Sequence, residues 1–249
     1  MLVRPLKTKK ILPGAQSMVE VLDESLEKVE EKNILVVTSK IVALCEGRAV
    51  PIKGNDKEEL IKQEADYYLP RRSSKWNFEF TITKKTLIMS AGIDESNTNG
   101  NYLLWPKDPQ KSVNEIRSYL KKRFSLETVG VIITDSSCTP MRWGTVGVPI
   151  AYSGFEPKKN YIGTKDLFGY TLKVSQSNIA GGLAAAAVVT MGEGKEQTPL
   201  ALISDIPFVS FLDHDPTQEE LDQYFIGHKE DDLFEPFLSS VKWLPGKNK

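Results

Sequence analysis

Apolar and polar residues follow two distinct patterns along this chain. Short runs rich in Val, Ile and Leu predict buried strands, because β-branched residues pack well on a pleated sheet. The clearest runs lie at residues 34–39, 86–93, 129–134, 146–152 and 200–204. Elsewhere apolar residues recur every three or four positions, the period of an amphipathic helix. We expect helices over residues 23–32, 57–68, 109–120, 179–189 and 216–226.

This mixture of helices and strands indicates an α/β or α+β fold. Residues 78–83 and 86–89 are expected to form a hairpin around Lys84 and Lys85. There is no internal repeat and no low-complexity linker, so we expect a single domain over residues 1–249. The polar residues 243–249 are expected to fray at its end.

Composition and charge exclude several classes of protein. The chain has 249 residues, 40% of them hydrophobic and 26% charged, as expected for an ordinary globular protein. Its net charge is −1 with scattered basic residues, which argues against a nucleic-acid partner. No apolar run reaches the ~18 residues of a membrane helix, and the basic start lacks the apolar stretch of a signal peptide. We therefore expect a cytoplasmic protein that acts on small molecules.

Cysteine and histidine are too sparse to carry the chemistry. Cys45 and Cys138 have no metal or redox spacing, so we interpret them as free thiols in a reducing compartment. His214 and His228 both lie in the polar C-terminal quarter, which disfavours histidine-based acyl transfer. Any catalysis is therefore expected to use carboxylates, hydroxyls, Lys, Arg and backbone amides.

Three acidic residues are candidate metal ligands. Asp94 and Asp135 each follow a strand-like run and open a loop of small polar residues, and Glu193 follows an Ala-rich helix. Open α/β folds build ligand sites at such strand ends, and Mg²⁺ prefers oxygen ligands. For either Asp alone, a turn cap is the better interpretation. The three together favour a metal-dependent enzyme that handles phosphate.

Other candidates also have plain structural alternatives. Ser39 and Lys40 follow a strand and are placed to hold phosphate, or simply form a cap and a solvated Lys. The turn Gly192–Gly194 is favoured as a helix C-cap over a phosphate loop, because the Walker A spacing fails. Arg142 and Lys165 lie in loops after Asp135 and are candidates for holding an acidic substrate, or are surface residues.

Several segments taken in order resemble the coenzyme F420:L-glutamate ligase family, also called F420-0 gamma-glutamyl ligase. The matches span about residues 12–205. They are Thr38-Ser39 with Glu46-Gly47-Arg48, Ala91-Gly92-Ile93-Asp94 with Ser96-Asn97, residues 130–135, Arg142 with Gly144, Ile162-Gly163 with residues 165–169, and Met191-Gly192-Glu193-Gly194.

The resemblance implies an α+β fold that forms an intertwined homodimer, with two entwined lobes as an alternative description of the single domain. It implies a ligase that uses GTP or ATP and two divalent metals, Mg²⁺ or Mn²⁺, to add L-glutamate through its amine to an acceptor carboxylate by way of an acyl phosphate. By position, Asp94 and Asp135 hold one metal, Ser136 replaces a Thr ligand, and Glu193 serves the second metal. The implied nucleotide contacts are Leu12, Pro13, Ser39, Lys40, Asn97, Met191, Gly192 and Gly194.

Two departures from the family pattern leave alternatives open. Leu44 stands where the family has a nucleotide-contacting Lys, and Gly181-Gly182 stands where it has acidic residues. A homologue that binds nucleotide without catalysis is the first alternative, and an unrelated metal-dependent phosphohydrolase is the second. Residues 103–109 are similar to a branch thought to glutamylate folates, so the acceptor is expected to be F420-0 or a folate.

Overall fold

The core of the chain is a five-stranded mixed sheet in a computed structural model that describes residues 1–71, 75–76 and 78–247. Only β2 and β8 run parallel, so both deliver their carboxyl ends to the same edge of the sheet. The strands, in spatial order, are β1 (Leu2–Leu6), β12 (Leu200–Ser204), β2 (Ile34–Thr38), β8 (Gly130–Cys138) and β9 (Thr145–Ser153).

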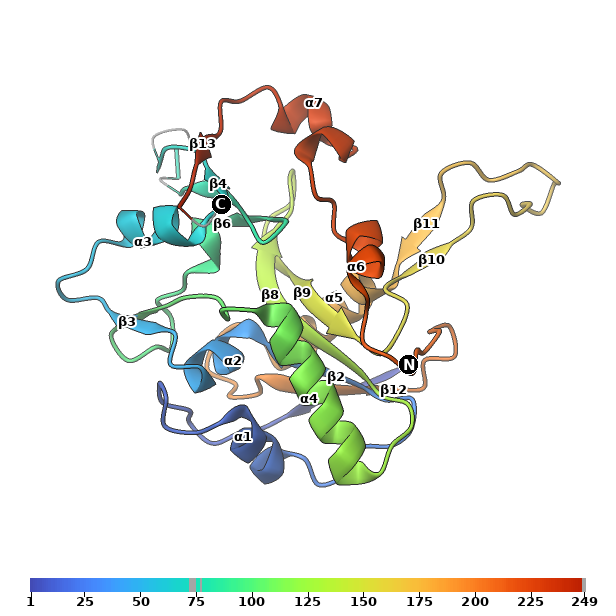
Figure 1. Cartoon of the computed structure of the whole chain (residues 1–249), viewed down its shortest axis with the longest axis horizontal. Helices are drawn as coiled ribbons and strands as arrows, with labels where there is room; N and C mark the ends of the chain where they lie inside the picture. The colour runs from blue at the N-terminus through green and yellow to red at the C-terminus, as the bar shows by residue number, and fades with distance from the viewer. Residues whose placement is uncertain (72–74, 77, 248–249) are drawn as a thin grey trace.

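Helices cover both faces of this sheet. Alternate residues of a strand point to opposite faces, so Leu35 and Val37 join one apolar cluster while Ile34 and Val36 join the other. Figure 1 shows α4 lying across the near face. The first cluster contains residues of α1 (Met18–Ser25), α2 (Ser39–Cys45) and α4 (Pro109–Phe124); the second contains residues of α5 (Ile179–Met191) and α6 (Gln218–Tyr224).

A smaller group of elements packs beside the sheet and has its own apolar cluster. It includes a four-stranded sheet in the order β13-β4-β5-β6 and a separate pair of strands, β3 and β7. A 3-10 turn, η2 (Ser90–Gly92), follows β6. The other bounds are α3 (Lys57–Glu64), β3 (Ala49–Pro51), β4 (Tyr67–Tyr68), β5 (Phe80–Thr83), β6 (Thr86–Met89), β7 (Asn101–Leu103) and β13 (Leu244–Pro245).

A long hairpin projects away from the body of the molecule (Figure 1). Its base is formed by β10 (Lys158–Asn160) and β11 (Gln176–Asn178), and its tip carries Leu167 and Phe168, which are 99% and 95% exposed. The chain then returns to the body and ends with two short elements before β13: η3 (Lys229–Asp231) and α7 (Glu235–Leu238). Within the described ranges, none of the helices combines the length and apolar character that a membrane crossing requires.

The α+β class is confirmed, and most of the predicted elements are present. The hairpin around Lys84 and Lys85 joins β5 to β6, and Asp108 caps α4 with Pro109 in its first turn. The strand expected at 129–134 is correct in position but too short. It continues through Asp135 to Cys138, past an irregularity in its pairing with β9 between Ile133 and Thr134.

Three predicted helices have the wrong bounds. The helix expected at 23–32 lies at Met18–Ser25, because Ser17 and Glu20 form a reciprocal capping box that starts it early. The helix expected to reach residue 68 ends at Glu64, since Tyr67–Tyr68 pair with β5. The helix expected from residue 216 begins at Gln218, where Thr217 and Glu220 make a second capping box.

The expected frayed tail over residues 243–249 is also wrong for its described part. Leu244–Pro245 pair with β4 as β13, and the amides of Gly246 and Lys247 donate to the carbonyls of Asp66 and Lys62. Residues 248 and 249 of the expected tail lie outside the described residues.

Gly92 is held in a conformation and a space that only glycine suits. Its φ is +73°, and a Cβ there would lie 2.0 Å from the indole nitrogen of Trp105. Gly100 also has a positive φ, +81°, but a Cβ there meets no atom within 4 Å. Alanine at position 100 therefore adds backbone strain alone, whereas alanine at position 92 adds strain and steric overlap.

We expect Gly92→Ala to lower the free energy of unfolding by about 3 kcal/mol or more, because about 1–2 kcal/mol of left-handed strain adds to about 1–3 kcal/mol of overpacking. Gly100→Ala should lower the free energy of unfolding by the backbone strain alone, about 1–2 kcal/mol. Urea unfolding of both variants measures the difference. Equal losses would show that Trp105 moves aside at no cost.

Candidate functional site

A cavity of about 520 Å³ opens where β2 ends and its parallel pairing with β8 stops, at Thr38 and Thr134. Its size lies within the range of small-molecule sites. Five segments far apart in the sequence form most of its wall. They are the N-terminal stretch Thr8–Pro13, α2 with Thr38 before it, the loop Ser96–Asn99, residues 134–136 of β8, and the turn after α5 with residues up to Pro199. The cavity therefore lies at the edge of the sheet to which both parallel strands run.

The acidic side of the cavity is built from β8 and the turn after α5. Asp135 and Ser136 line it from β8, and Glu193 lines it from the turn. The hydroxyls of Ser136 and Thr145 donate to Glu193 Oε1 at 2.6 and 3.1 Å. Two of the predicted metal ligands, Asp135 and Glu193, thus lie on one wall, with Ser136 between them in the same network.

Asp135 is held by a residue that no pattern in the sequence singled out. The indole nitrogen of Trp105 donates to Asp135 Oδ2 at 2.5 Å, and Trp105 is only 2% exposed. The amide of Ser136 donates to the other oxygen, Oδ1, at 2.9 Å. Both carboxylate oxygens are therefore oriented before any ligand arrives.

Lys40 stands between Asp94 and the cavity. Its ammonium forms an ion pair with Asp94 and donates to Ser96 Oγ at 3.1 Å. Lys40 and Ser96 line the cavity, whereas Asp94 does not contribute to its wall. Asp94 and Asp135 are thus brought to the same region, with Asp94 covered by a cation.

The glycine turn after α5 is a helix C-cap and a cavity wall at once. Gly192 caps α5 with a φ of +81°, as the structural interpretation predicted. Met191, Gly192 and Gly194 line the cavity together with Asn97, whose side-chain amide donates to the carbonyl of Gly194 at 3.0 Å.

The opposite wall is partly apolar. Leu12 and Pro13, two of the predicted nucleotide contacts, line it together with Ile41 and Leu44 of α2. Lys40 and Leu44 are four residues apart on α2, so they occupy one helix face. Ser39 is the exception among the predicted nucleotide contacts, because it is buried and absent from the wall.

Two further features of the wall were given no role by the sequence analysis. Thr38 lines the cavity, and its buried hydroxyl is one of the few described side-chain atoms without a hydrogen-bond partner. Lys9 and Lys10 also line the cavity from the N-terminal stretch, where the basic run Lys7–Lys10 was an available signal. An unpaired donor and additional cations make this wall suited to an anionic ligand.

Arg142 and Lys165 do not lie in the cavity of this chain. Arg142 is exposed and donates to the carbonyl of Met141, and Lys165 is exposed on the projecting hairpin. Within one chain, therefore, neither side chain lines the cavity that contains Asp135.

The donor set fits a hard divalent cation that is shared with a ligand. Among the described residues, no three His, Cys, Asp or Glu side chains gather closely enough to hold a metal by themselves. Mg²⁺ is usually bound through one or two carboxylates, with waters and substrate phosphates completing its shell. Asp135, Glu193 and the Ser136 hydroxyl match that arrangement, and the unpaired Thr38 hydroxyl adds a donor nearby.

Burial and hydrogen bonding affect the two aspartates in opposite directions. Burial raises the pKa of Asp135 to about 6, although the bonds from Trp105 and Ser136 oppose the rise. Burial also acts against the charge of Asp94, but the bonds from Lys40 and the Ser96 amide hold its pKa below the ordinary value. Of these two carboxylates, Asp135 is therefore the one whose charge is poorly compensated by the described part of the chain.

Comparison with known proteins gives consistent matches. The model of the family described as F420-0:Gamma-glutamyl ligase matches residues 5–205. Three proteins from strains of Methanococcus maripaludis, each named Coenzyme F420:L-glutamate ligase, are similar to this chain. The strain C6 protein is 35% identical over 83% of this chain and 86% of its own length, and the strain S2 protein is 33% identical over 92% and 86%. The strain C7 protein is 43% identical over 64% of this chain, which spans 61% of that relative.

We expect the metal-free protein to lose stability as pH rises from the ordinary range of an Asp pKa to about 6. In that window the folded state binds a proton at Asp135 that the unfolded state has lost, so the free energy of unfolding falls with pH. Asp135→Asn should remove this contribution and be at least as stable as the unmodified protein above pH 6. Urea unfolding with a chelator, compared between the two proteins across this range, measures it. Parallel pH profiles would contradict the assignment.

Proposed function

Because this chain belongs to the F420-0:gamma-glutamyl ligase family, we propose that it is a ligase that adds L-glutamate through a gamma linkage to a small carboxylate-bearing cofactor. GTP or ATP would drive the reaction, with Mg²⁺ or Mn²⁺ bound at the acidic wall. F420-0 is the acceptor that the family description favours, and a folate is the alternative that residues 103–109 suggest.

One observation carries this proposal. The cavity is lined by oriented carboxylates of β8 and the α5 turn, by Lys40, and by the glycines of that turn. A polyphosphate chain requires such a combination of cation, backbone donors and metal-binding oxygens. Among the described residues, the cavity contains no histidine, and phosphoryl transfer needs none.

The proposed chemistry proceeds in two steps. The acceptor carboxylate attacks the terminal phosphorus of the nucleotide, breaks its bond to the bridging oxygen, and yields an acyl phosphate and a nucleoside diphosphate. The amine of L-glutamate then attacks the acyl carbon and loses a proton as inorganic phosphate leaves. A bound Mg²⁺ or Mn²⁺ would supply positive charge against the phosphate oxygens.

The side chains of the cavity have defined parts in this scheme. Asp135, Ser136 and Glu193 would hold metal, and Trp105 would keep Asp135 oriented. Lys40 would leave Asp94 for a nucleotide phosphate, which frees Asp94 as a further ligand. Leu44 would contribute an apolar contact where the family pattern has a cation, so Lys40 carries more of the phosphate charge in this chain.

We also propose that the protein is a homodimer in which the projecting hairpin contacts a second copy. The hairpin tip exposes Leu167 and Phe168 almost completely, and large apolar side chains in one exposed segment mark interaction sites. Arg142 and Lys165 lie outside this chain's cavity. In such a dimer they would bind acidic substrates in the cavity of the partner subunit.

We expect a molecular mass of twice 27.9 kDa from light scattering of the full chain. Replacing Leu167 and Phe168 with Asp should weaken the dimer, because burying a charge without a partner is costly. The matched control replaces Leu233, which is 96% exposed outside the hairpin, with Asp. A monomer at micromolar concentration would contradict the proposal, and so would a dimer that the Leu233 variant disrupts equally.

The ligase proposal is tested by incubating the protein with Mg²⁺ or Mn²⁺, GTP or ATP, labelled L-glutamate and either F420-0 or a folate. We expect the mass of one acceptor to rise by one glutamate residue, with one phosphate released for each bond. Nucleotide binding without incorporation on either acceptor would favour the inactive homologue. Phosphate release that does not depend on glutamate or acceptor would favour a phosphohydrolase.

In the same assay, Asp135→Asn should lower turnover by about 10²-fold or more, because it removes an ionised metal ligand. Asp205→Asn is the matched control. Asp205 is exposed, lies outside the cavity and has a φ of +54°, a conformation that Asn tolerates well. The control should keep full activity. Wild-type turnover by Asp135→Asn would remove Asp135 from the mechanism.

A further inference from the structure

A second cavity, of about 380 Å³, lies in the smaller group of elements and has no part in the function proposed so far. Its wall comes from the start of α3 and the two residues before it, Arg71, the residues just before β5, η2, β7 and the loop after Asp94. The residues that line it are Asn55, Asp56, Lys57, Glu58, Arg71, Phe78, Glu79, Ser90, Glu95 and Tyr102.

Two ion pairs between different segments meet in this cavity. The ammonium of Lys57 contacts Glu95 at 2.7 Å, and Arg71 Nε lies 3.5 Å from Glu79. The side chain of Glu79 is only 5% exposed. Burying a carboxylate is costly unless cations or hydrogen bonds compensate, so a buried Glu facing an open space indicates a use for its charge.

The second cavity shares a thin wall with the first. Asp94 and Leu103 form a reciprocal pair of backbone hydrogen bonds of 3.0 and 2.8 Å. Leu103 and Ser96 line the first cavity, while their neighbours Tyr102 and Glu95 line the second. Successive side chains of extended backbone point to opposite sides, which explains why one two-stranded wall serves both cavities.

The backbone at the base of this wall is strained. Ser90 and Ala91 have φ values of +53° and +54°, which non-glycine residues rarely adopt, and both are buried. Such strain persists where the surrounding structure enforces it, often at binding sites. Here it turns the chain after β6 so that Ser90 lines the second cavity and the following loop reaches the first.

We propose that the second cavity binds the free α-amino-acid substrate, L-glutamate. Its two carboxylates would be held by Lys57 and Arg71, and its ammonium would lie between Glu79 and Glu95. The two ion pairs would thus be exchanged for pairs with the ligand. Three positive charges would then face four carboxylates, and the remaining negative charge would stay hydrated at Glu95, whose side chain is 47% exposed. The hydroxyls of Ser90 and Tyr102 add polar contacts. This assignment rests on the proposed ligase function.

The position of this cavity suits a nucleophile-binding site. Glu95 lines the second cavity and its neighbour Ser96 lines the first. One loop would therefore hold the amine and also border the proposed phosphate site. The cavity is also too acidic for a polyphosphate, because Asp56, Glu58, Glu79 and Glu95 outnumber Lys57 and Arg71. Its charges therefore favour a small molecule that carries an amine.

The test is calorimetric titration of L-glutamate into the full chain with nucleotide and Mg²⁺ present. Lys57→Met and Glu79→Gln should each weaken binding by about tenfold or more, since hydrogen bonds to charged groups contribute about 1.5–3 kcal/mol. Glutarate, which lacks the amine, should bind about tenfold more weakly than L-glutamate to the unmodified protein. Lys57 is partly exposed at the end of a helix, so its variant tests the site even if Glu79→Gln does not fold.

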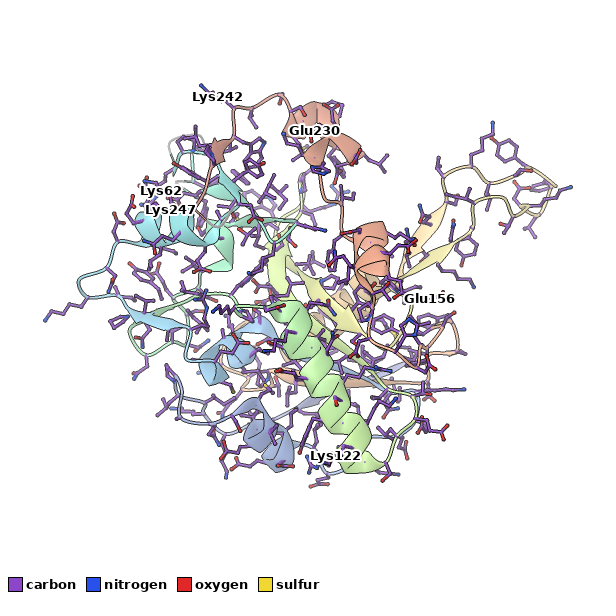
Figure 2. All side chains as sticks on the ribbon, in the orientation of Figure 1. Lys62, Lys122, Glu156, Glu230, Lys242 and Lys247 are labelled. Carbon is purple, nitrogen blue, oxygen red and sulfur yellow. The ribbon has the colours of Figure 1, made fainter. Side chains whose placement is uncertain are left out.

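Lys247→Met is the matched control. Lys247 lies beside Lys62 of α3 (Figure 2), pairs with Glu59 and is outside the cavity. We expect it to bind L-glutamate like the unmodified protein. An equal loss in this control, or no loss in Lys57→Met, would overturn the proposal, as would the absence of L-glutamate binding to the unmodified protein at millimolar concentration.

Ligase kinetics separate this proposal from the one on which it rests. Lys57→Met should raise the KM for L-glutamate about tenfold or more and leave the KM for nucleotide unchanged. An unchanged KM for L-glutamate would disprove the amino-acid site while the ligase stands. L-glutamate binding that depends on Lys57, in a protein that forms no gamma-glutamyl product, would disprove the ligase while the amino-acid site stands.

Discussion

The hydrogen bond from Trp105 to Asp135 is the interaction on which the site depends. Trp105 is buried between the two groups of elements, and its indole also fills the space that a side chain at position 92 would need. It therefore fixes the strand that carries Asp135 relative to the turn that precedes Asp94. A ligand site assembled from such distant segments requires a rigid support of this kind, because small displacements of charged groups cost binding and catalysis.

The same site keeps its acidic groups satisfied before a ligand binds. Lys40 neutralises Asp94, and two hydroxyls donate to Glu193. Asp135 is the exception, since the described residues give it hydrogen bonds but no cation in direct contact, and its pKa is raised to about 6. A cation is therefore favoured most at Asp135. In the proposed function, a cation at Asp135 would repel Lys40, which acts on Asp135 through its charge, and so release Lys40 and Asp94 for ligands. Metal binding would then be coupled to nucleotide binding.

Local patterns in the sequence were enough to identify much of this architecture. The buried strands at β2 and β12 and the cap at Asp108 follow from periodicity and capping rules, and the order of short motifs pointed to the family. Residues that act through distant contacts could not be identified this way. Trp105 carries no local sign of its bond to Asp135, and the extension of β8 through Asp135 depends on pairing with β9. Lys165 was associated with the site by its sequence position, but it lies on a hairpin that leaves the body of the chain.

The proposed function requires the first cavity to bind a nucleotide and a metal ion together. A crystal structure of the full chain with Mn²⁺ and a non-hydrolysable GTP analogue tests it most directly, because anomalous scattering locates the metal independently of the nucleotide. We expect a manganese ion about 2 Å from oxygens of Asp135 and the triphosphate, with Lys40 turned from Asp94 to a phosphate. Triphosphate bound elsewhere, with the Lys40–Asp94 pair intact and no metal at Asp135, would contradict it.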